Sequence, residues 1–133
     1  MVLNKILGMN FHSISQTNLI KNLDNEIYLN NKNQYISITN TEALYFGDHN
    51  KDHFNYINGA YLSLCDGIGV KIGAFFKSKK VVRYNGPKLF EDVINHGQKF
   101  GWTHYFLGGK KEVINNLKTK TLIKGFYFQK FIF

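Results

Sequence analysis

The stretch LCDGIGVKIGAFF, residues 64–76, decides the fold because it changes from strand to helix within a few residues. The apolar run AYLSLC, residues 60–65, is typical of a buried strand. Beyond it, apolar residues recur at i, i+4, i+7 and i+8, a spacing that predicts a helix packed on a sheet. The predicted sheet-facing residues are Ile68, Ile72, Phe75 and Phe76. Asp66 stands at the corner between strand and helix.

The same corner occurs twice more along the chain. YISIT, residues 35–39, precedes a helix that begins near Asn40, and WTHYFLGG, residues 102–109, precedes the helical pattern KKEVINNLK, residues 110–118. Strands that alternate with helices imply crossover connections and a parallel sheet. The sequence therefore predicts an α/β fold, with a Rossmann-like, mostly parallel sheet and helices on both faces, in one domain over residues 1–133. Ligands bind such sheets beyond the carboxyl ends of the strands.

The remaining segments have weaker patterns. We expect a short strand over residues 5–11, a helix over 13–27, short helical turns over 47–60 and a further strand over 121–128. Another helix is expected to begin at Pro87, behind Gly86. The core-facing residues of these two helices are predicted to be Ile14, Leu19 and Leu23 in the first, and Leu89, Val93, Ile94 and Gly97 in the second.

The amino-acid composition indicates which classes of partner and which cellular compartment to expect. The net charge of +8 and the pI near 9.5 favour anionic partners, such as nucleic acid, a phospholipid surface or a phosphorylated small molecule. No recognised nucleic-acid-binding motif surrounds the basic run of residues 77–83, so nucleic acid is not the expected partner. Cys65 is the only cysteine, which favours a reducing, cytoplasmic compartment. Because no apolar run of about 18 residues occurs, membrane contact is expected to be peripheral.

Glycines gather at the predicted corners. Gly67 and Gly69 follow one strand, and Gly108 and Gly109 follow another. Glycine lets a ligand approach the backbone closely, and the start of a helix offers unpaired N–H groups to a phosphate. The alternative is that these glycines serve only as turns. The pattern GIGVKIG, residues 67–73, has its third glycine one position late for a dinucleotide-binding loop, so a dinucleotide is not expected.

Asp66 and Arg83 each allow a structural and a functional interpretation. Asp66 would cap the following helix in one, and act as a general base for a sugar hydroxyl in the other. Arg83 is either a solvated surface residue or a bidentate ligand of a phosphate. His49 and His53 lie at i, i+4 and share a face if they belong to one helix, but no ligand motif surrounds them and no metal is expected.

Five motifs in this order resemble the bacterial glycosyltransferases of the WecG/TagA/CpsF family. They are ILG at 6–8, TNTEAL at 39–44, LCDGIGVK at 64–71, VRYNGPKLF at 82–90 and FLGGKKEV at 106–113. The resemblance extends over most of the chain. It implies transfer of a sugar, often N-acetylmannosamine, from a UDP donor to a polyprenyl-diphosphate-linked acceptor during synthesis of teichoic acid or capsule. It also implies that no metal or other cofactor takes part, and that the enzyme works at the inner face of the plasma membrane.

The resemblance also assigns roles to residues. It implies that Asp66 is the catalytic base and that Asn40 lines the same pocket. We expect Asn40 and Thr39 to orient substrate. The residues expected near the donor diphosphate are Arg83, Gly67, Gly69, Gly86, Gly108 and Gly109. Family members usually carry a threonine two residues before the asparagine, where this chain has Ile38. Thr39 does not simply replace it, because neighbouring strand residues point to opposite faces.

Family domains also continue further than this sequence, which ends in GFYFQKFIF, so we expect an incomplete domain. Phe126, Phe128, Phe131 and Phe133 are then expected to be exposed and to favour a homo-oligomer. Two alternatives stay open at this point. One is a non-catalytic fragment that binds a nucleotide sugar, and the other is a basic nucleic-acid binder whose affinity falls steeply with salt.

Overall fold

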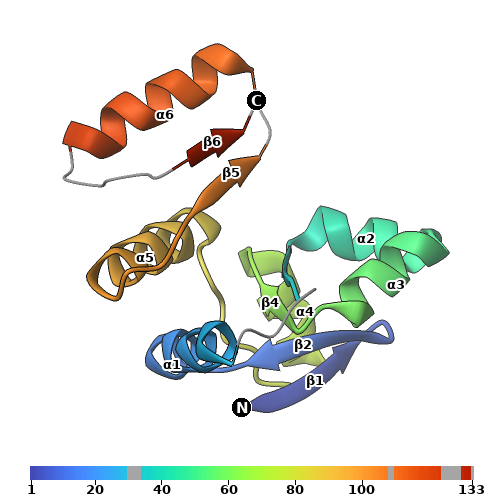
Figure 1. Ribbon diagram of the computed structural model, residues 1–133. Coiled ribbons are helices and arrows are strands. Elements are labelled where there is room, and N and C mark those ends of the chain that lie inside the picture. Colours follow the sequence, from blue (N-terminus) through green and yellow to red (C-terminus); the bar gives the residue numbers. More distant parts are fainter. Residues whose placement is uncertain (30–33, 108–109, 124–129, 133) are drawn as a thin grey trace. The chain divides into compact units, whose positions relative to one another are not determined.

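The computed structural model of the chain describes residues 1–29, 34–107, 110–123 and 130–132 (Figure 1). The chain forms two compact units, Met1–Lys88 and Leu89–Phe133, and each is described by itself. The first unit contains β1 (Val2–Ile6), β2 (Met9–Ser13), α1 (Gln16–Tyr28), β3 (Ile36–Thr39), α2 (Thr41–His49), α3 (Lys51–Gly59), β4 (Leu62–Cys65) and α4 (Ile68–Phe76). The second holds most of α5 (Gly86–Lys99), then β5 (Tyr105–Leu107), α6 (Lys111–Ile123) and β6 (Lys130–Ile132).

The first unit opens with an antiparallel hairpin rather than the single strand predicted over residues 5–11. β1 pairs with β2 from Val2↔Ser13 to Ile6↔Met9. The turn residues Leu7 and Gly8 both have positive φ, 50° and 77°, as a tight two-residue hairpin turn requires. The prediction of one strand was wrong because an apolar leucine occupies the first turn position, where asparagine or aspartate usually marks such a turn.

The strands β3 and β4 form the parallel pair that the sequence predicts. Their register runs from Ile36↔Leu62 to Thr39↔Cys65, and Cys65 also forms a parallel bridge with Arg83. The segment around Arg83 therefore extends the sheet on the far side of β4. Three chain segments reach the same carboxyl edge, which is where parallel sheets place their ligand sites.

The hairpin is tied to β4 by a histidine. The backbone N–H of Ser63 donates to Nδ1 of His12 across 3.0 Å, so β2 runs beside β4. Burial lowers the pKa of His12. The hydrophobic core of this unit consists of Ile6, Met9, Phe11, Leu44, Ile57, Cys65, Val70, Ala74 and Val81.

Residues 41–59 form two full helices, α2 and α3, where only short helical turns were expected beyond residue 46 (Figure 1). Asn50 ends α2 and begins α3, and its Oδ1 accepts a hydrogen bond from His53 N at 2.9 Å. The cap satisfies an otherwise unpaired N–H at the start of α3, which allows a second helix in a polar segment.

The predicted inner face of α4 is wrong, although the helix itself is confirmed. Val70 and Ala74 are its buried residues, 1% and 0% exposed. Both belong to the hydrophobic core of the first unit. The start of the helix also approaches α2 closely, because a Cβ added at Gly69 would overlap Thr41 Oγ1. The apolar residues predicted to face inward are instead exposed, with Ile68 at 64%, Ile72 at 49%, Phe75 at 76% and Phe76 at 81%.

In the second unit, β5 and β6 are parallel, with Tyr105↔Lys130 and Leu107↔Ile132 in register. The strand predicted over residues 121–128 is partly wrong, because α6 continues to Ile123, and residues 124–129 lie outside the described chain. The expected inner face of α5 is confirmed at its buried residues Leu89, Ile94 and Gly97. Among the described helices of either unit, none is long and apolar enough to cross a membrane.

Of the strand pairs in the described residues, β3–β4 and β5–β6 are parallel and only β1–β2 is antiparallel. The protein has a mixed α/β fold that is consistent with the Rossmann-like architecture predicted from the sequence. The carboxyl edge of β3–β4 lies within the first unit.

Candidate functional site

The candidate site lies where the chain leaves β3 and β4. The backbone N–H of Asp66 donates to Thr39 O at 2.9 Å, and the N–H of Tyr84 donates to Cys65 O at 2.7 Å. These bonds hold three chain segments side by side at the carboxyl edge of the sheet. We call the residues that meet there, Ile38, Asn40, Asp66, Gly67 and Gly86, the Asp66 corner.

The Asp66 carboxylate faces a position that has no side chain. A Cβ added at Gly86 would lie 3.5 Å from Asp66 Oδ2 and 3.8 Å from Ile38 Cγ2. Because Gly86 has no side chain, a position beside the carboxylate that a methyl group would fit stays unfilled. Ile38 borders the same space and is 40% exposed, so the apolar residue at the family's threonine position lies next to the acid.

The N-cap interpretation of Asp66 is wrong. The N-cap of α4 is Gly67, which has φ of 88° and makes no side-chain capping bond. Within the described residues, no hydrogen bond to the Asp66 carboxylate is formed, and the residue is half-buried. Since no described residue bonds to it, this half-buried carboxylate is available to accept a proton or a hydrogen bond from a ligand.

The starts of α2 and α4 lie close together at this corner. A Cβ at Gly67 would lie 4.0 Å from Asn40 Cβ, and Asn40 is exposed. Asn40 Oδ1 caps α2 by accepting from Ala43 N at 2.8 Å. This cap fixes the side chain and leaves its Nδ2 amide group to donate to a ligand.

Thr39 lies on the opposite face of the sheet. Its side chain is 1% exposed, and Oγ1 bonds to Ser37 Oγ at 3.0 Å and to Ser63 Oγ at 3.4 Å. The contribution of Thr39 to the corner is its backbone carbonyl, which accepts the Asp66 N–H. The alternation of strand side chains explains why Ile38, and not Thr39, lies beside the acid.

The pKa of the Cys65 thiol is shifted by burial and by the charges around the Asp66 corner. Burial raises the pKa of its thiol to about 11, and the negative charge of Asp66 acts in the same direction. Arg83 and Lys71 act in the opposite direction, which places both cations within electrostatic range of this strand end. Arg83 is exposed and thus accessible to an anion.

Other predicted residues do not join this corner. Gly108 and Gly109, which follow β5, lie outside the described residues, as do Phe126, Phe128 and Phe133. His49 and His53 do not share one helix, because α2 ends at His49 and α3 begins after Asn50. In the described part of the chain, no group of three or more metal-ligating side chains occurs.

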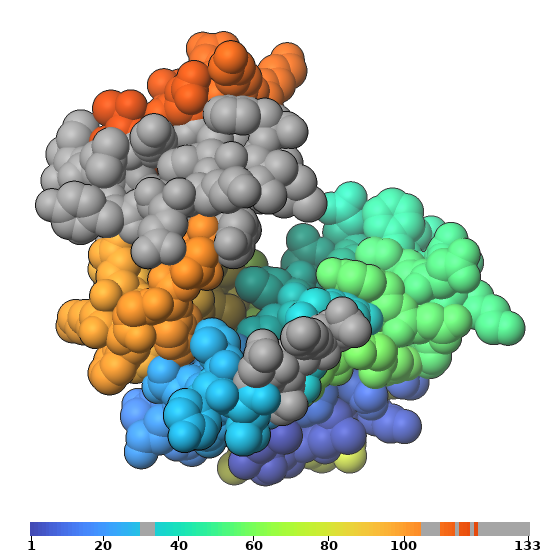
Figure 2. Space-filling view, viewed as in Figure 1, coloured from blue at the N-terminus to red at the C-terminus, as the bar shows by residue number. Residues whose placement is uncertain are grey.

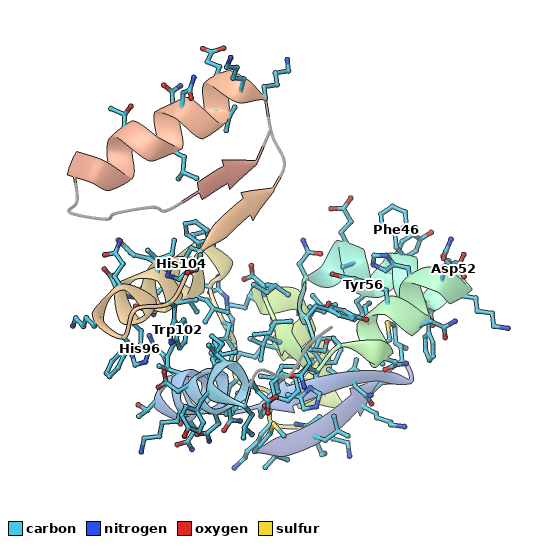
Figure 3. The ribbon with its side chains drawn as sticks, in the orientation of Figure 1. Phe46, Asp52, Tyr56, His96, Trp102 and His104 are labelled. Carbon is cyan, nitrogen blue, oxygen red and sulfur yellow. The ribbon has the colours of Figure 1, made fainter. Side chains whose placement is uncertain are left out.

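A separate pocket of about 390 Å³ on α2 and α3 was not predicted. It is lined by Phe46, Asn50, Asp52, His53 and Tyr56, of which Figure 3 labels three. In the space-filling view, α2 and α3 form one continuous surface (Figure 2). Asn50, where α2 ends and α3 begins, is one of the lining residues, so the pocket depends on a helix boundary that the sequence pattern did not predict.

The chain matches the model of a known family. The model of the family described as "Glycosyl transferase WecG/TagA/CpsF family" matches residues 4–125 of this 133-residue chain. No curated protein matches the chain. The matched region includes every residue of the Asp66 corner.

Proposed function

Because the chain belongs to the WecG/TagA/CpsF family of glycosyl transferases, we propose that it transfers a sugar from a UDP-sugar donor at the Asp66 corner. Family membership supports a transferase that uses a nucleotide-sugar donor and an acceptor. The observation that carries the assignment to this corner is the Asp66 carboxylate, which faces the open space at Gly86.

Asp66 acts as the general base in this proposal. The acceptor hydroxyl oxygen attacks the anomeric carbon of the donor sugar, and the bond between that carbon and the diphosphate oxygen breaks. UDP leaves with the bonding electrons, and the hydroxyl proton passes to the Asp66 carboxylate. A base near an attacking hydroxyl contributes on the order of 10²–10⁴ to rate. In this proposal the acceptor hydroxyl approaches the carboxylate beside Gly86, where no side chain intervenes.

The donor diphosphate binds on the cationic side of the corner. Arg83 is exposed and carries a planar, bidentate phosphate-binding group. The N-terminal turn of α4 offers backbone N–H groups, beginning at the glycines of residues 67 and 69. Asn40 donates its amide to the sugar or the phosphate. Thr39 positions Asp66 through its carbonyl, and Gly86 keeps the space open.

The finer substrate identity follows from the family resemblance. We propose N-acetylmannosamine or a related hexose as the donor sugar, and a polyprenyl-diphosphate-linked sugar as the acceptor, in cell-surface polysaccharide or teichoic acid synthesis. The reaction takes place at the cytoplasmic face of the membrane. The net charge of +8 suits both a diphosphate donor and an anionic lipid acceptor.

Ile38 supports a second candidate, a chain that binds the nucleotide sugar without turning it over. An isoleucine beside the carboxylate cannot donate a hydrogen bond to a substrate, whereas the threonine usual in the family can. In this alternative, donor binding persists while transfer is absent.

The test is UDP release by the 133-residue chain with a short-chain lipid-diphosphate acceptor. UDP-N-acetylmannosamine is compared with UDP-N-acetylglucosamine, UDP-glucose and GDP-mannose, and binding of each donor is measured by calorimetry. Acceptor-dependent release from one UDP-sugar supports transfer. Donor binding without release supports the second candidate, and no binding of any nucleotide sugar contradicts both.

A further inference from the structure

The outward side of α4 is an exposed apolar surface that the proposed reaction does not use. It comprises Ile68, Ile72, Phe75 and Phe76, which we call the α4 outer face; their exposed fractions range from 49% to 81%. Their spacing places them on one side of the helix. The rings of Phe75 and Phe76 contact each other edge to face, with centroids 6.2 Å apart. A contiguous apolar surface of this kind marks an interaction site.

Lysines accompany the α4 outer face in the sequence. Lys71 lies within the helix, and Lys77, Lys79 and Lys80 follow directly after it; all four are exposed. No acidic residue occurs between Asp66 and Glu91. This segment therefore combines large exposed apolar side chains with lysines and no acidic residue, which is the composition of helices that lie in the interface of an anionic membrane.

We propose that the α4 outer face docks the protein onto an anionic phospholipid surface. The isoleucines and phenylalanines enter the boundary between headgroups and acyl chains, while the lysines bind the phosphates of neighbouring lipids. A second copy of the chain fits this surface less well. Pairing two α4 outer faces would bring two sets of four lysines together, and like charges at an interface oppose association.

Docking through α4 places the Asp66 corner near the lipid headgroups. The helix begins two residues after Asp66 and has nine residues, so it extends about 13 Å at 1.5 Å per residue. A helix lying on the membrane keeps its N-terminal end at the surface. The acid would then lie close to the depth at which the diphosphate of a lipid-linked acceptor resides. This consequence rests on the proposed function, whereas lipid binding itself does not.

The test is co-sedimentation of the full chain with vesicles, with no sugar donor present. Vesicles of phosphatidylcholine alone are compared with vesicles of equal parts phosphatidylglycerol and phosphatidylcholine. We expect binding to the anionic vesicles, weaker binding at high salt, and little binding to phosphatidylcholine. UDP release is measured separately, so a failure of lipid binding and a failure of catalysis are distinguishable.

Two groups of variants locate the contact. All the substituted side chains are exposed, so folding should persist and is checked by circular dichroism. We expect Phe75→Gln with Phe76→Gln to weaken binding at least tenfold, because each ring loses buried apolar area. Each lysine near an anionic surface strengthens binding roughly fivefold, so Lys77→Gln, Lys79→Gln and Lys80→Gln together should weaken it on the order of a hundredfold. The matched controls are Tyr28→Gln with Leu29→Gln, and Lys21→Gln with Lys51→Gln and Lys99→Gln.

Three results would overturn the proposal. The first is absence of binding to anionic vesicles by the folded wild-type chain. The second is equal loss of binding in the control variants, which would indicate only a general effect of charge or hydrophobicity. The third is a wild-type dimer that the Phe75 and Phe76 substitutions convert to a monomer without affecting vesicle binding, because the α4 outer face would then be an interface between copies.

Discussion

Gly86 is the residue that gives Asp66 its open space. The position beside the carboxylate is empty because glycine has no Cβ, and an added Cβ would lie 3.5 Å from Asp66 Oδ2, an ordinary contact distance. A methyl group should thus be tolerated by the fold, but it would occupy the place through which the acceptor hydroxyl approaches in the proposed reaction. A substitution at this position should therefore change activity without much change in the stability of the protein.

We predict that Gly86→Ala lowers UDP release at least tenfold and changes the free energy of unfolding by less than about 1 kcal/mol. Steady-state assays and urea denaturation test the two parts. Gly73→Ala is the control, because a Cβ there meets nothing within 4 Å. Wild-type activity in Gly86→Ala would show that the acceptor does not approach through this space.

The Cys65 thiol should be unreactive in the folded protein. It is fully buried, and burial, followed by the charge of Asp66, raises its pKa to about 11. Because the thiolate is the reactive form, both accessibility and ionisation are low at pH 8. We predict slow labelling by a thiol reagent at pH 8 that becomes fast in urea. Rapid labelling of the native chain would contradict this prediction and would mean that the C-terminal end of β4 unfolds locally.

At the scale of single residues, sequence reasoning identified most of the corner. Asn40 and Asp66 were placed because each follows an apolar strand, and the structure brings both to one sheet edge. The period-2 alternation of strands also predicted that Ile38 and Thr39 face opposite ways. The open space at Gly86 was not predictable, because it depends on a segment that meets β4 through a single bridge between Cys65 and Arg83.

At the scale of elements, α4 shows where hydrophobic periodicity fails. The helix IGVKIGAFF has one charged residue, so apolar side chains occur on nearly every side. Periodicity then identifies a helix but cannot choose its inner face. The inner face is the one that joins the hydrophobic core, where Val70 and Ala74 pack, while the larger apolar side chains of the helix are exposed.

The start of α4 depends on a glycine in a conformation that other residues avoid. Gly67 has φ of 88° and ψ of 154°, whereas Gly73 lies inside the helix with open space around it. We predict that Gly67→Ala destabilises the protein by about 1–3 kcal/mol, and that Gly73→Ala stabilises it by up to about 1 kcal/mol through helix propensity. Urea denaturation compares the two. Equal free energies of unfolding for the two variants would mean that the backbone at residue 67 accommodates alanine without a loss of stability.

At the scale of the whole molecule, two half-buried histidines link stability to pH. Burial lowers the pKa of His12 in the first unit and of His104 in the second, from the ordinary value of 6.5. The unfolded chain therefore binds protons at a higher pH than the folded chain. The stability contributed by the neutral histidines is complete above pH 6.5 and is lost as the pH falls below it.

We predict lower stability at pH 5.5 than at pH 7.5 in urea denaturation followed by circular dichroism. Trp102, the only tryptophan, lies in the second unit and reports on it by fluorescence. His12→Gln keeps an acceptor for the Ser63 N–H but does not titrate, so it should reduce the pH dependence. An unchanged pH dependence in this variant would assign the effect to other groups.

The central claim is that Asp66 removes the acceptor proton, and Asp66→Asn tests it most directly. The measurement is the rate of UDP release together with the donor dissociation constant, for the wild-type chain, for Asp66→Asn and for the exposed control Asp48→Asn. The account predicts that Asp66→Asn loses at least about 100-fold in rate while donor binding and folding persist, and that Asp48→Asn resembles the wild type. Release by Asp66→Asn at the wild-type rate would contradict it.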